Sequence, residues 1–418
     1  MARLFQTYKH RLNTFLFFGI LAALPFGYFT PDLAQSFSFV GDLFLRSLSL
    51  MIIPIIFISV LSGILQFDQT EQLGRVGIKT VIYYAVTTAL AVITGLIMVN
   101  LIEPGKSELK LETAIHQKVD QQSASTNSGG LLEVTKKIIP TNIIQAASEG
   151  NVLGLIFFTV ILGLALLKHP GSGQEHIRQI VNVLFSSLIW MVDLIMLFAP
   201  IGIFALIGNL IAETILSKTI NTVGYEIFRY SLTVLAGLAI HGGLTLTLLL
   251  KYFKVSPIGF FKDMLPALLT AFSTASSAAT LPITIDSLEN RSNVPNKIAG
   301  FVASLGATVN MDGTAIYEAV AAVFIANIYG IELSFNNQLV VFLTATFSAI
   351  GAAGIPGAGL IMMTLVLSSV GLPAEGIGLI VVVDRILDMF RTCINVWGDS
   401  IGAKIIAVGE NESHILKE

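Results

Sequence analysis

The chain has 418 residues, of which 54% are hydrophobic and only 12% are charged. Soluble domains carry about 25% charged residues, so a soluble protein of this length would lack the charge that its surface needs. The net charge of −3 offers no basic face to a nucleic acid. The single cysteine, Cys393, excludes a disulfide framework and a cysteine-ligated metal site. A polytopic membrane protein remains.

Six apolar stretches in the first two thirds of the chain are candidates for membrane spans, since a helix crosses the hydrocarbon core with about 20 mostly apolar residues. They are Leu12–Phe29, Val40–Leu65, Thr80–Leu101, Val152–Leu167, Ile180–Ile211 and Ser231–Tyr252. The first run follows Arg3, Lys9 and Arg11, as the apolar part of a signal peptide would. The spans behind it favour a first transmembrane helix instead.

Lysine and arginine in the short loops predict the orientation in the membrane. The N-terminus is basic, the loop at Thr30–Phe37 has no basic residue, and the next loop has Arg75 and Lys79. We therefore expect the N-terminus in the cytoplasm and the loop near Glu103–Lys137 outside. Within that loop, the polar tract Gln121–Gly130 predicts a mobile surface segment.

Two later stretches do not read as ordinary spans. Ser273–Pro282 and Ser348–Gly359 are rich in small residues, and each lies between apolar arms too short to cross alone. Backbone without helical bonds survives at membrane depth only where it is buried or lines a polar cavity. Paired interruptions of this kind indicate the binding site of a secondary transporter. The alternative is that the small residues merely allow close helix packing.

Between these stretches, Thr308–Thr314 interrupts the long apolar run Ile298–Ile328 with residues that form helices poorly. We expect the helix to unwind here and to free carbonyl oxygens. Together with the carboxylate of Asp312 and the amide oxygen of Asn310, they would form the oxygen shell that a hard cation such as Na⁺ prefers. A buried aspartate with a structural partner is the alternative, but an ionisable residue at membrane depth points first to function.

The last apolar helix carries a polar stripe within an arc of roughly 100°, with Arg385 at its edge. Its members are Asp384, Asp388, Arg391, Thr392, Asn395 and Asp399. Two arginines do not neutralise three aspartates, and an unpaired buried carboxylate is costly, so a bound cation is expected. The planar fork of Arg391 suits a substrate carboxylate. An internal network in which Asp384 pairs with Arg391 is the alternative.

These motifs together resemble the glutamate transporter family, which includes archaeal aspartate transporters, bacterial glutamate symporters and mammalian excitatory amino acid transporters. The matching stretches are Asn310–Thr314 (NMDGT), the serine-rich tip before Pro282, the second tip through Gly359, and Asp388–Asp399 (DMFRTCINVWGD). The resemblance implies an all-α membrane protein with eight transmembrane helices, two re-entrant helical hairpins, inverted repeats and a homotrimeric assembly. In such a protein a transport domain moves like an elevator, and the second hairpin is the extracellular gate.

The resemblance also implies a division of the chain into a scaffold and a transport domain. The scaffold would comprise residues 1–75 and 131–220, the transport domain residues 76–130 and 221–409, and a C-terminal tail residues 410–418.

A substrate site for L-aspartate or L-glutamate is implied by the same resemblance. Arg391 would bind the side-chain carboxylate, together with Thr314 and the backbone near Gly359. Asp388 would hold the α-amino group, with Thr392 nearby. The α-carboxylate would be held by Asn395, Ser276 and Ser277.

Three Na⁺ sites are implied as well, all built from oxygen atoms. The first would use Asp399, Asn395, Asn310 and the carbonyl of Gly306. The second would use the carbonyls of Thr308, Ala349, Ile350 and Ala352. The third would use Tyr84, Thr87, Thr88, Asn310 and Asp312.

The segment Tyr317–Val320 (YEAV) resembles the mammalian members in particular. In those members, the glutamate that matches Glu318 is linked to H⁺ cotransport and K⁺ countertransport. Burial favours the neutral form of a carboxyl group, which suits a proton carrier. Permanent pairing with Arg385 is the alternative. Archaeal relatives have an arginine where this chain has Ala275, and Arg385 would supply a comparable charge. Asp384 and Tyr317 are expected to support the binding residues from behind.

We therefore expect a Na⁺-coupled symporter that imports acidic amino acids, without an organic cofactor and without a nucleic-acid partner. Its expected location is the cell (inner) membrane, among lipids, with both termini in the cytoplasm. The alternatives are an H⁺-coupled glutamate or C4-dicarboxylate symporter of the same fold, an anion channel, and an intramembrane enzyme with His241 as a base for Ser276 or Ser277. Asp388 favours an amino acid over a dicarboxylate, because it suits an ammonium group.

Overall fold

The structure is a computed structural model that describes residues 2–65, 71–106, 139–148, 151–169, 171–216, 219–352, 354 and 357–415. Every regular element within these ranges is a helix, which confirms the all-α prediction. The tract predicted to be a mobile surface segment, Gln121–Gly130, lies outside the described residues.

In the described part of the first half of the chain, six helices have 16 to 32 residues and two have six residues each. They are α1 (Ala2–Phe29), α2 (Pro31–Ser36), α3 (Ser38–Leu65), α4 (Glu71–Ile102), α7 (Ile143–Ser148), α8 (Val152–Leu167), α9 (Ser172–Met196) and α10 (Ala199–Leu216).

The second half has more interruptions, and its α-helices range from 7 to 39 residues in length. Its elements are α11 (Ile220–Ile240), the π-helical segment η1 (His241–Thr245), α12 (Leu246–Tyr252), α13 (Pro257–Thr274), α14 (Ser277–Asn290), α15 (Asn296–Val309), α16 (Asp312–Ile328), α17 (Phe335–Gly351), α18 (Ala358–Ser369), the 3₁₀ turn η2 (Ala374–Gly376) and α19 (Ile377–Ile415).

Within the described part of the chain, six helical stretches are long and apolar enough to cross a membrane. They are Pro31–Leu65, Arg75–Ile102, Ser172–Met196, Ala199–Leu216, Ile220–Tyr252 and Asn296–Ile328. One prediction is wrong here, because Ile180–Ile211 is not a single span. It is divided between α9 and α10 by a turn at Leu197 and Phe198. Pro200 follows this turn and has no N–H to donate to the preceding turn of a continuous helix.

A helix pair lies at each stretch that is rich in small residues. In the first pair, Ala275 adopts a left-handed φ of 48° between α13 and α14, and the Ser276 hydroxyl caps α14 by accepting the Ala279 N–H at 3.1 Å. Pro282 lies inside α14 rather than in this turn. The second pair is α17 and α18, which pack against each other.

The predicted unwinding between the pairs occurs, but it is short. Only Asn310 and Met311 are non-helical, while Asp312 already begins α16. A carboxylate is favourable in the first turn of a helix because the N–H groups there have no helical partners.

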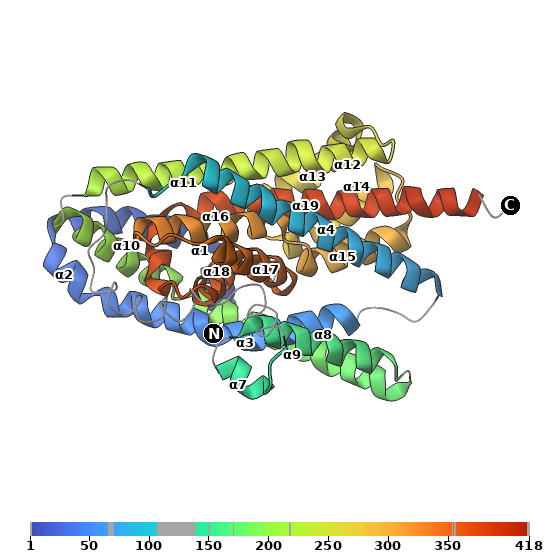
Figure 1. Ribbon diagram of the computed structural model, residues 1–418, viewed down its shortest axis with the longest axis horizontal. Helices are drawn as coiled ribbons and strands as arrows, with labels where there is room; N and C mark the ends of the chain where they lie inside the picture. The colour runs from blue at the N-terminus through green and yellow to red at the C-terminus, as the bar shows by residue number, and fades with distance from the viewer. Residues whose placement is uncertain are drawn as a thin grey trace.

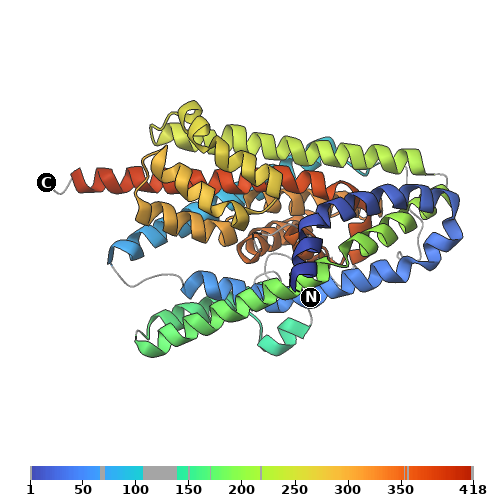
Figure 2. The ribbon, with the colours of Figure 1, turned by 180° about the vertical axis from the view of Figure 1, so that it is seen from behind.

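The helices form two packed groups. In Figures 1 and 2, α3, α8 and α9 of one group lie below α19 and α4 of the other, while α1, α2 and α10 lie at one end of the bundle. In one group, α3 contacts α8, α9 and α10, and α10 also packs against α1 and α2. In the other group, α19 contacts α11, α13, α15 and α16, while α4 packs against α11, α16 and α17. The groups meet mainly where α3 and α10 contact α17, α18 and α19.

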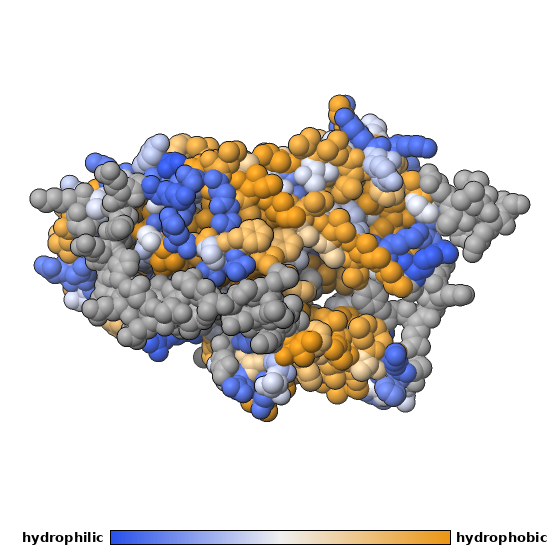
Figure 3. Space-filling view, viewed as in Figure 1, coloured by the Kyte–Doolittle hydropathy of each residue, from blue (hydrophilic) through white to orange (hydrophobic). Residues whose placement is uncertain are grey.

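The outer surface is strongly apolar, as Figure 3 shows over the middle of the bundle. Large side chains such as Leu101 (74% exposed) and Ile144 (78% exposed) point outward. In contrast, α16 is buried almost throughout, including its polar residues Asp312, Thr314 and Glu318. Polar groups inside and apolar groups outside are the arrangement that a lipid environment favours.

Candidate functional site

The polar stripe of α19 faces the interior of the second helix group. Its six members are between 0% and 7% exposed, and Arg391 is fully buried. Because the stripe is enclosed by protein on an otherwise apolar helix, each of its charged groups needs a partner.

Arg391 finds its partners on its own helix and on α16. Its Nη2 donates to the Asp388 carboxylate at 2.7 Å and lies 3.1 Å from an oxygen of Asp384. Its guanidinium carbon lies 3.8 Å from the centre of the Tyr317 ring, a close cation–π contact. The guanidinium is therefore held in one orientation by charge and by stacking.

The other side of the same guanidinium is open to hydrogen bonding. Its Nε and Nη1 have no hydrogen-bond partner among the described residues. A methyl group added at Gly359 would meet Nη1 at 3.0 Å, so Gly359 brings the N-terminus of α18 against the guanidinium. Unused N–H donors beside a helix N-terminus form a natural carboxylate site.

Asn395 and Thr314 extend the polar surface beside Arg391. Asn395 accepts the backbone N–H of Gly313 at 2.7 Å and lies 3.4 Å from the Thr314 hydroxyl. The Thr392 hydroxyl donates within α19, to the carbonyl of Asp388, at 2.8 Å. Gly313 is required at this contact, because a side chain there would overlap the backbone of Arg391.

The two helix pairs meet at their tips. The Ser276 hydroxyl donates to the carbonyl of Gly354 at 2.7 Å, and the N–H of Ala278 donates to the same oxygen at 3.0 Å. The N–H of Gly357 donates to Asp388 at 3.2 Å. Ser277 is buried in this contact region. The second tip therefore reaches the polar stripe, and the first tip, with Ser276 and Ser277, closes on the second.

A second polar cluster lies where α15 gives way to α16. The Thr88 hydroxyl donates to Asp312 at 2.8 Å, and the Asn310 amide donates to Asp399 at 3.0 Å. The Thr87 hydroxyl lies 3.4 Å from the amide oxygen of Asn310. The cluster thus combines two carboxylates, an amide and two hydroxyls at full burial.

Tyr84 and Gly306 border this cluster. The Tyr84 hydroxyl donates to the carbonyl of Val302 at 2.7 Å, and a side chain at Gly306 would overlap both the Asp399 carboxylate and the Tyr84 hydroxyl. Apart from Asn395, which lies beside Thr314, the residues predicted for the first and third cation sites therefore lie together. Carboxylate, amide, hydroxyl and carbonyl oxygens are the ligand types that hard cations prefer.

The residues predicted for the second cation site lie on α15 and at the end of α17, which contact each other. Thr308 is in the last turn of α15, Ala349 and Ile350 are in the last turn of α17, and Ala352 follows it. The last carbonyls of a helix have no helical N–H partner, so these positions offer oxygen atoms to a ligand.

Glu318 is fully buried and accepts a short hydrogen bond from the Ser348 hydroxyl of α17. Its second oxygen, Oε1, has no hydrogen-bond partner among the described residues. The alternative of a permanent Glu318–Arg385 pair is not what the structure has, because Arg385 lies 3.8 Å from Asp388 instead.

Two contacts of this region were not predicted from the sequence. His241 lies 3.0 Å from Asp312 through Nε2, and Ser348 binds Glu318. Each is a single polar residue whose partner lies on another helix. For His241, the signal in the sequence was a single histidine in an apolar span, but this signal did not identify Asp312 as its partner.

Comparison of the sequence with known proteins identifies the family of this chain. Residues 12–408 match the sodium:dicarboxylate symporter family. The chain is 38% identical to an excitatory amino acid transporter of Caenorhabditis elegans, over 90% of this chain and 82% of the relative. It is 36% identical to excitatory amino acid transporter 2 of Mus musculus, over 90% of this chain and 74% of the relative. For excitatory amino acid transporter 3 of the same species, the identity is 37% over 88% of this chain and 78% of the relative. The chain belongs to the sodium:dicarboxylate symporter family.

Proposed function

We propose that this protein is a Na⁺-coupled symporter that imports L-aspartate and L-glutamate across the cell membrane. The observation that carries the proposal is the buried guanidinium of Arg391, whose Nε and Nη1 have no described partner, beside the carboxylate of Asp388. The transporters to which the chain is similar are named for excitatory amino acids, which supports the same substrate class.

On substrate binding, Asp388 would exchange its present hydrogen-bond partners for the ammonium group of the amino acid. Its carboxylate now binds Arg391 and the N–H of Gly357. An incoming side-chain carboxylate would occupy Nε and Nη1 of Arg391 and Thr314, and the ammonium group would take the oxygens of Asp388 near Thr392. Asn395, Ser276 and Ser277 would bind the α-carboxylate through neutral donors, while the side-chain carboxylate and the ammonium group would each have an oppositely charged partner.

Na⁺ ions would be carried with the substrate at three sites, grouped around Asp312, around Asp399, and around the helix ends at Thr308 and Ala349. An acidic amino acid carries a net charge of −1, so three Na⁺ ions make the step move two positive charges. At about 2.3 kcal/mol per charge, this gains about 4.6 kcal/mol per 100 mV of membrane potential. A single Na⁺ or H⁺ would gain nothing from the potential.

The coupling of H⁺ and K⁺ would depend on Glu318, whose Oε1 has no described partner. The neutral form would accompany substrate into the cell, and the charged form would return with K⁺.

The movement itself would be an elevator motion of the second helix group against the first. The proposed architecture has eight transmembrane helices, two re-entrant hairpins, a homotrimeric scaffold and both termini in the cytoplasm. In support, the polar residues of both clusters lie within the helix group of α19 and α4, while α1, α2, α3 and α8–α10 form the other group.

Ligand binding to the purified protein tests the proposal. Aspartate, glutamate and succinate, which lacks the ammonium group, are titrated in Na⁺ or in choline. We expect tight binding of an amino acid in Na⁺, weak binding of succinate, and loss of both in choline. Equal binding of succinate and aspartate would contradict the amino acid as substrate and favour a C4-dicarboxylate. Aspartate binding of equal strength in Na⁺ and in choline would contradict the proposed Na⁺ coupling.

A further inference from the structure

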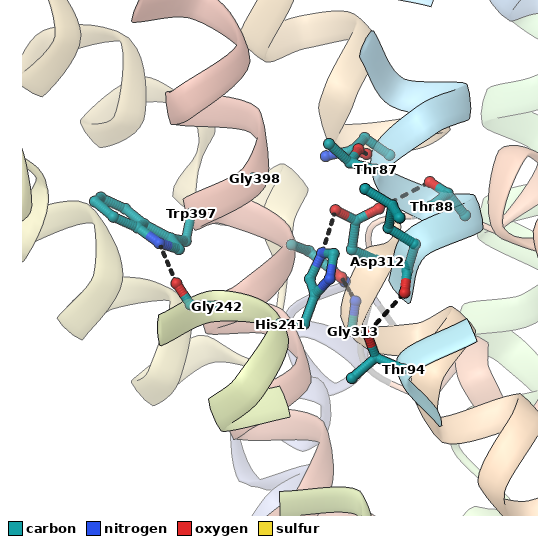
Figure 4. Close-up of polar contacts among 12 residues, drawn as sticks. Thr87, Thr88, Thr94, His241, Gly242, Asp312, Gly313, Trp397 and Gly398 are labelled. Carbon is teal, nitrogen blue, oxygen red and sulfur yellow. Dashed lines mark hydrogen bonds and ion pairs between the residues drawn. The ribbon is translucent and has the colours of Figure 1, made fainter. Parts of the chain in front are cut away.

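The carboxylate of Asp312 is held at both of its oxygens by side chains from two different helices. The Thr88 hydroxyl of α4 donates to Oδ1 at 2.8 Å, and Nε2 of His241 lies 3.0 Å from Oδ2. Figure 4 shows Asp312 between these two residues. Asp312 and His241 are 0% exposed and Thr88 is 1% exposed, so the three groups depend on each other for hydrogen bonding.

The Thr88 hydroxyl and Nε2 of His241 differ in whether they can also coordinate a cation. A hydroxyl can donate to a carboxylate and can also turn to offer a lone pair. An imidazole nitrogen that carries a proton is a donor only. An ionised carboxylate only accepts, so for Asp312 as a cation ligand the donor in this contact is Nε2 of His241. Nδ1 has no hydrogen-bond partner among the described residues, so the single function that the contacts give this ring is to hold Oδ2.

His241 is fixed in place by an irregularity of its own helix. It begins the π-helical segment η1, in which the carbonyl of the next residue, Gly242, accepts the indole N–H of Trp397 at 3.2 Å. A methyl group added at Gly242 would meet the Ile394 side chain at 2.5 Å. The segment is therefore locked against α19, and π-helical turns of this kind are frequent at functional sites.

We infer that His241 is a positioning residue for the Na⁺ ion that binds at Asp312. This inference rests on the proposed Na⁺-coupled function. With Oδ2 held by His241, the carboxylate keeps its orientation when Thr88 turns its hydroxyl away from Oδ1. Oδ1 and the Thr88 oxygen then face the ion together, with no rotation of the carboxylate. Groups that orient metal ligands in this way typically change metal affinity by 10–100-fold when they are lost.

A matched pair of substitutions tests the geometry. In His241→Gln the amide nitrogen is the same number of bonds from Cα as Nε2, so it still reaches Oδ2. In His241→Asn the amide nitrogen corresponds to Nδ1 and falls short. We measure aspartate binding to the purified, full-length protein at increasing Na⁺ concentrations, and then aspartate affinity at saturating Na⁺.

We expect His241→Asn to need about 10-fold more Na⁺ for half-maximal binding, with the aspartate affinity at saturating Na⁺ unchanged. His241→Gln should stay within about 3-fold of the unmodified chain. Thr247→Val is the control, because it removes only a long contact to the Gly242 carbonyl (3.4 Å) on the same helix. If His241→Asn does not fold, as judged by thermal unfolding, His241→Met provides the same comparison without a donor.

An unchanged Na⁺ requirement in His241→Asn, or an equal loss in His241→Asn and His241→Gln, would overturn the inference and leave the proposed function intact. Na⁺-independent aspartate binding by the unmodified chain would instead overturn the proposed function, and the inference with it.

Discussion

Arg391 is the positive charge that balances the buried carboxylates of Asp384 and Asp388 in the polar stripe of α19. It lies fully buried between Asp384 and Asp388, with two nitrogens that have no described partner. Replacement by alanine removes the nearest cation from both aspartates, so that Asp388 keeps only its long ion pair with Arg385 among the described residues, and it removes the guanidinium donors that fit a side-chain carboxylate at this point. Losing one partner of a buried charged pair costs about 2–5 kcal/mol.

We therefore predict that Arg391→Ala weakens aspartate binding by at least about 30-fold, the equivalent of about 2 kcal/mol. Isothermal titration of the purified protein checks this. Arg291→Ala is the control, because Arg291 is exposed and follows α14, outside both polar clusters. Retained affinity in Arg391→Ala would contradict the assigned role of the guanidinium.

Glu318 gives a second prediction at the residue scale. Glu318→Gln keeps the shape of the side chain but cannot take up or release a proton. We expect the variant to lose any dependence of net uptake on external H⁺ and internal K⁺, while exchange of internal for external aspartate continues. Counterflow and net uptake in proteoliposomes distinguish the two modes. Ser348→Ala removes the hydrogen-bond donor and keeps the carboxyl group, so it should retain the ion dependence.

At the scale of the elements, close contact between α16 and α19 positions both polar clusters. Gly313 allows this contact, because a side chain there would overlap the backbone of Arg391. We predict that Gly313→Ala lowers the free energy of unfolding by about 1–3 kcal/mol, as overpacking does, and weakens aspartate binding. Gly300→Ala in α15 has no neighbouring atom within 4 Å and should not destabilise the protein. Thermal unfolding in detergent compares them.

The meeting of the two helix tips is a second feature at this scale. Ser276→Ala removes one of the two donors to the Gly354 carbonyl. A hydrogen bond contributes about 0.5–1.5 kcal/mol, so we predict a roughly 2–10-fold faster exchange of amide hydrogens in α17 and α18. Ser273→Ala is the control, because its hydroxyl bonds only within α13, to the carbonyl of Leu269. Equal exchange in both variants would show that the tips are not held by Ser276.

Much of this arrangement can be predicted from the sequence, for physical reasons that differ between elements. Long apolar runs identify most helices, and the residues of NMDGT identify the break before α16. The break at Leu197 and Phe198 was missed because apolar residues flank it on both sides. The contacts of His241 and Ser348 could not be predicted, since their partners lie more than 25 positions away along the chain and only helix packing brings them together.

At the scale of the whole molecule, the net charge that is transported with each substrate determines how strongly the membrane potential drives uptake. The polar clusters lie in one group, while the apolar outer surface of the bundle suits lipid. If three Na⁺ ions accompany each acidic amino acid, transport moves net positive charge inward. We predict that an inside-negative potential set with valinomycin accelerates uptake at constant Na⁺ gradient. A rate that ignores the potential would indicate electroneutral coupling.

Uptake of radiolabelled aspartate and glutamate into proteoliposomes tests the central claim most directly, with Na⁺, H⁺ and internal K⁺ gradients imposed one at a time. A Na⁺ gradient alone should accumulate intact substrate against its concentration gradient, and the Arg391→Ala variant should not. Accumulation driven by an H⁺ gradient alone, without Na⁺, would contradict the cation sites at Asp312 and Asp399. Substrate that only equilibrates across the membrane under every gradient would contradict active transport.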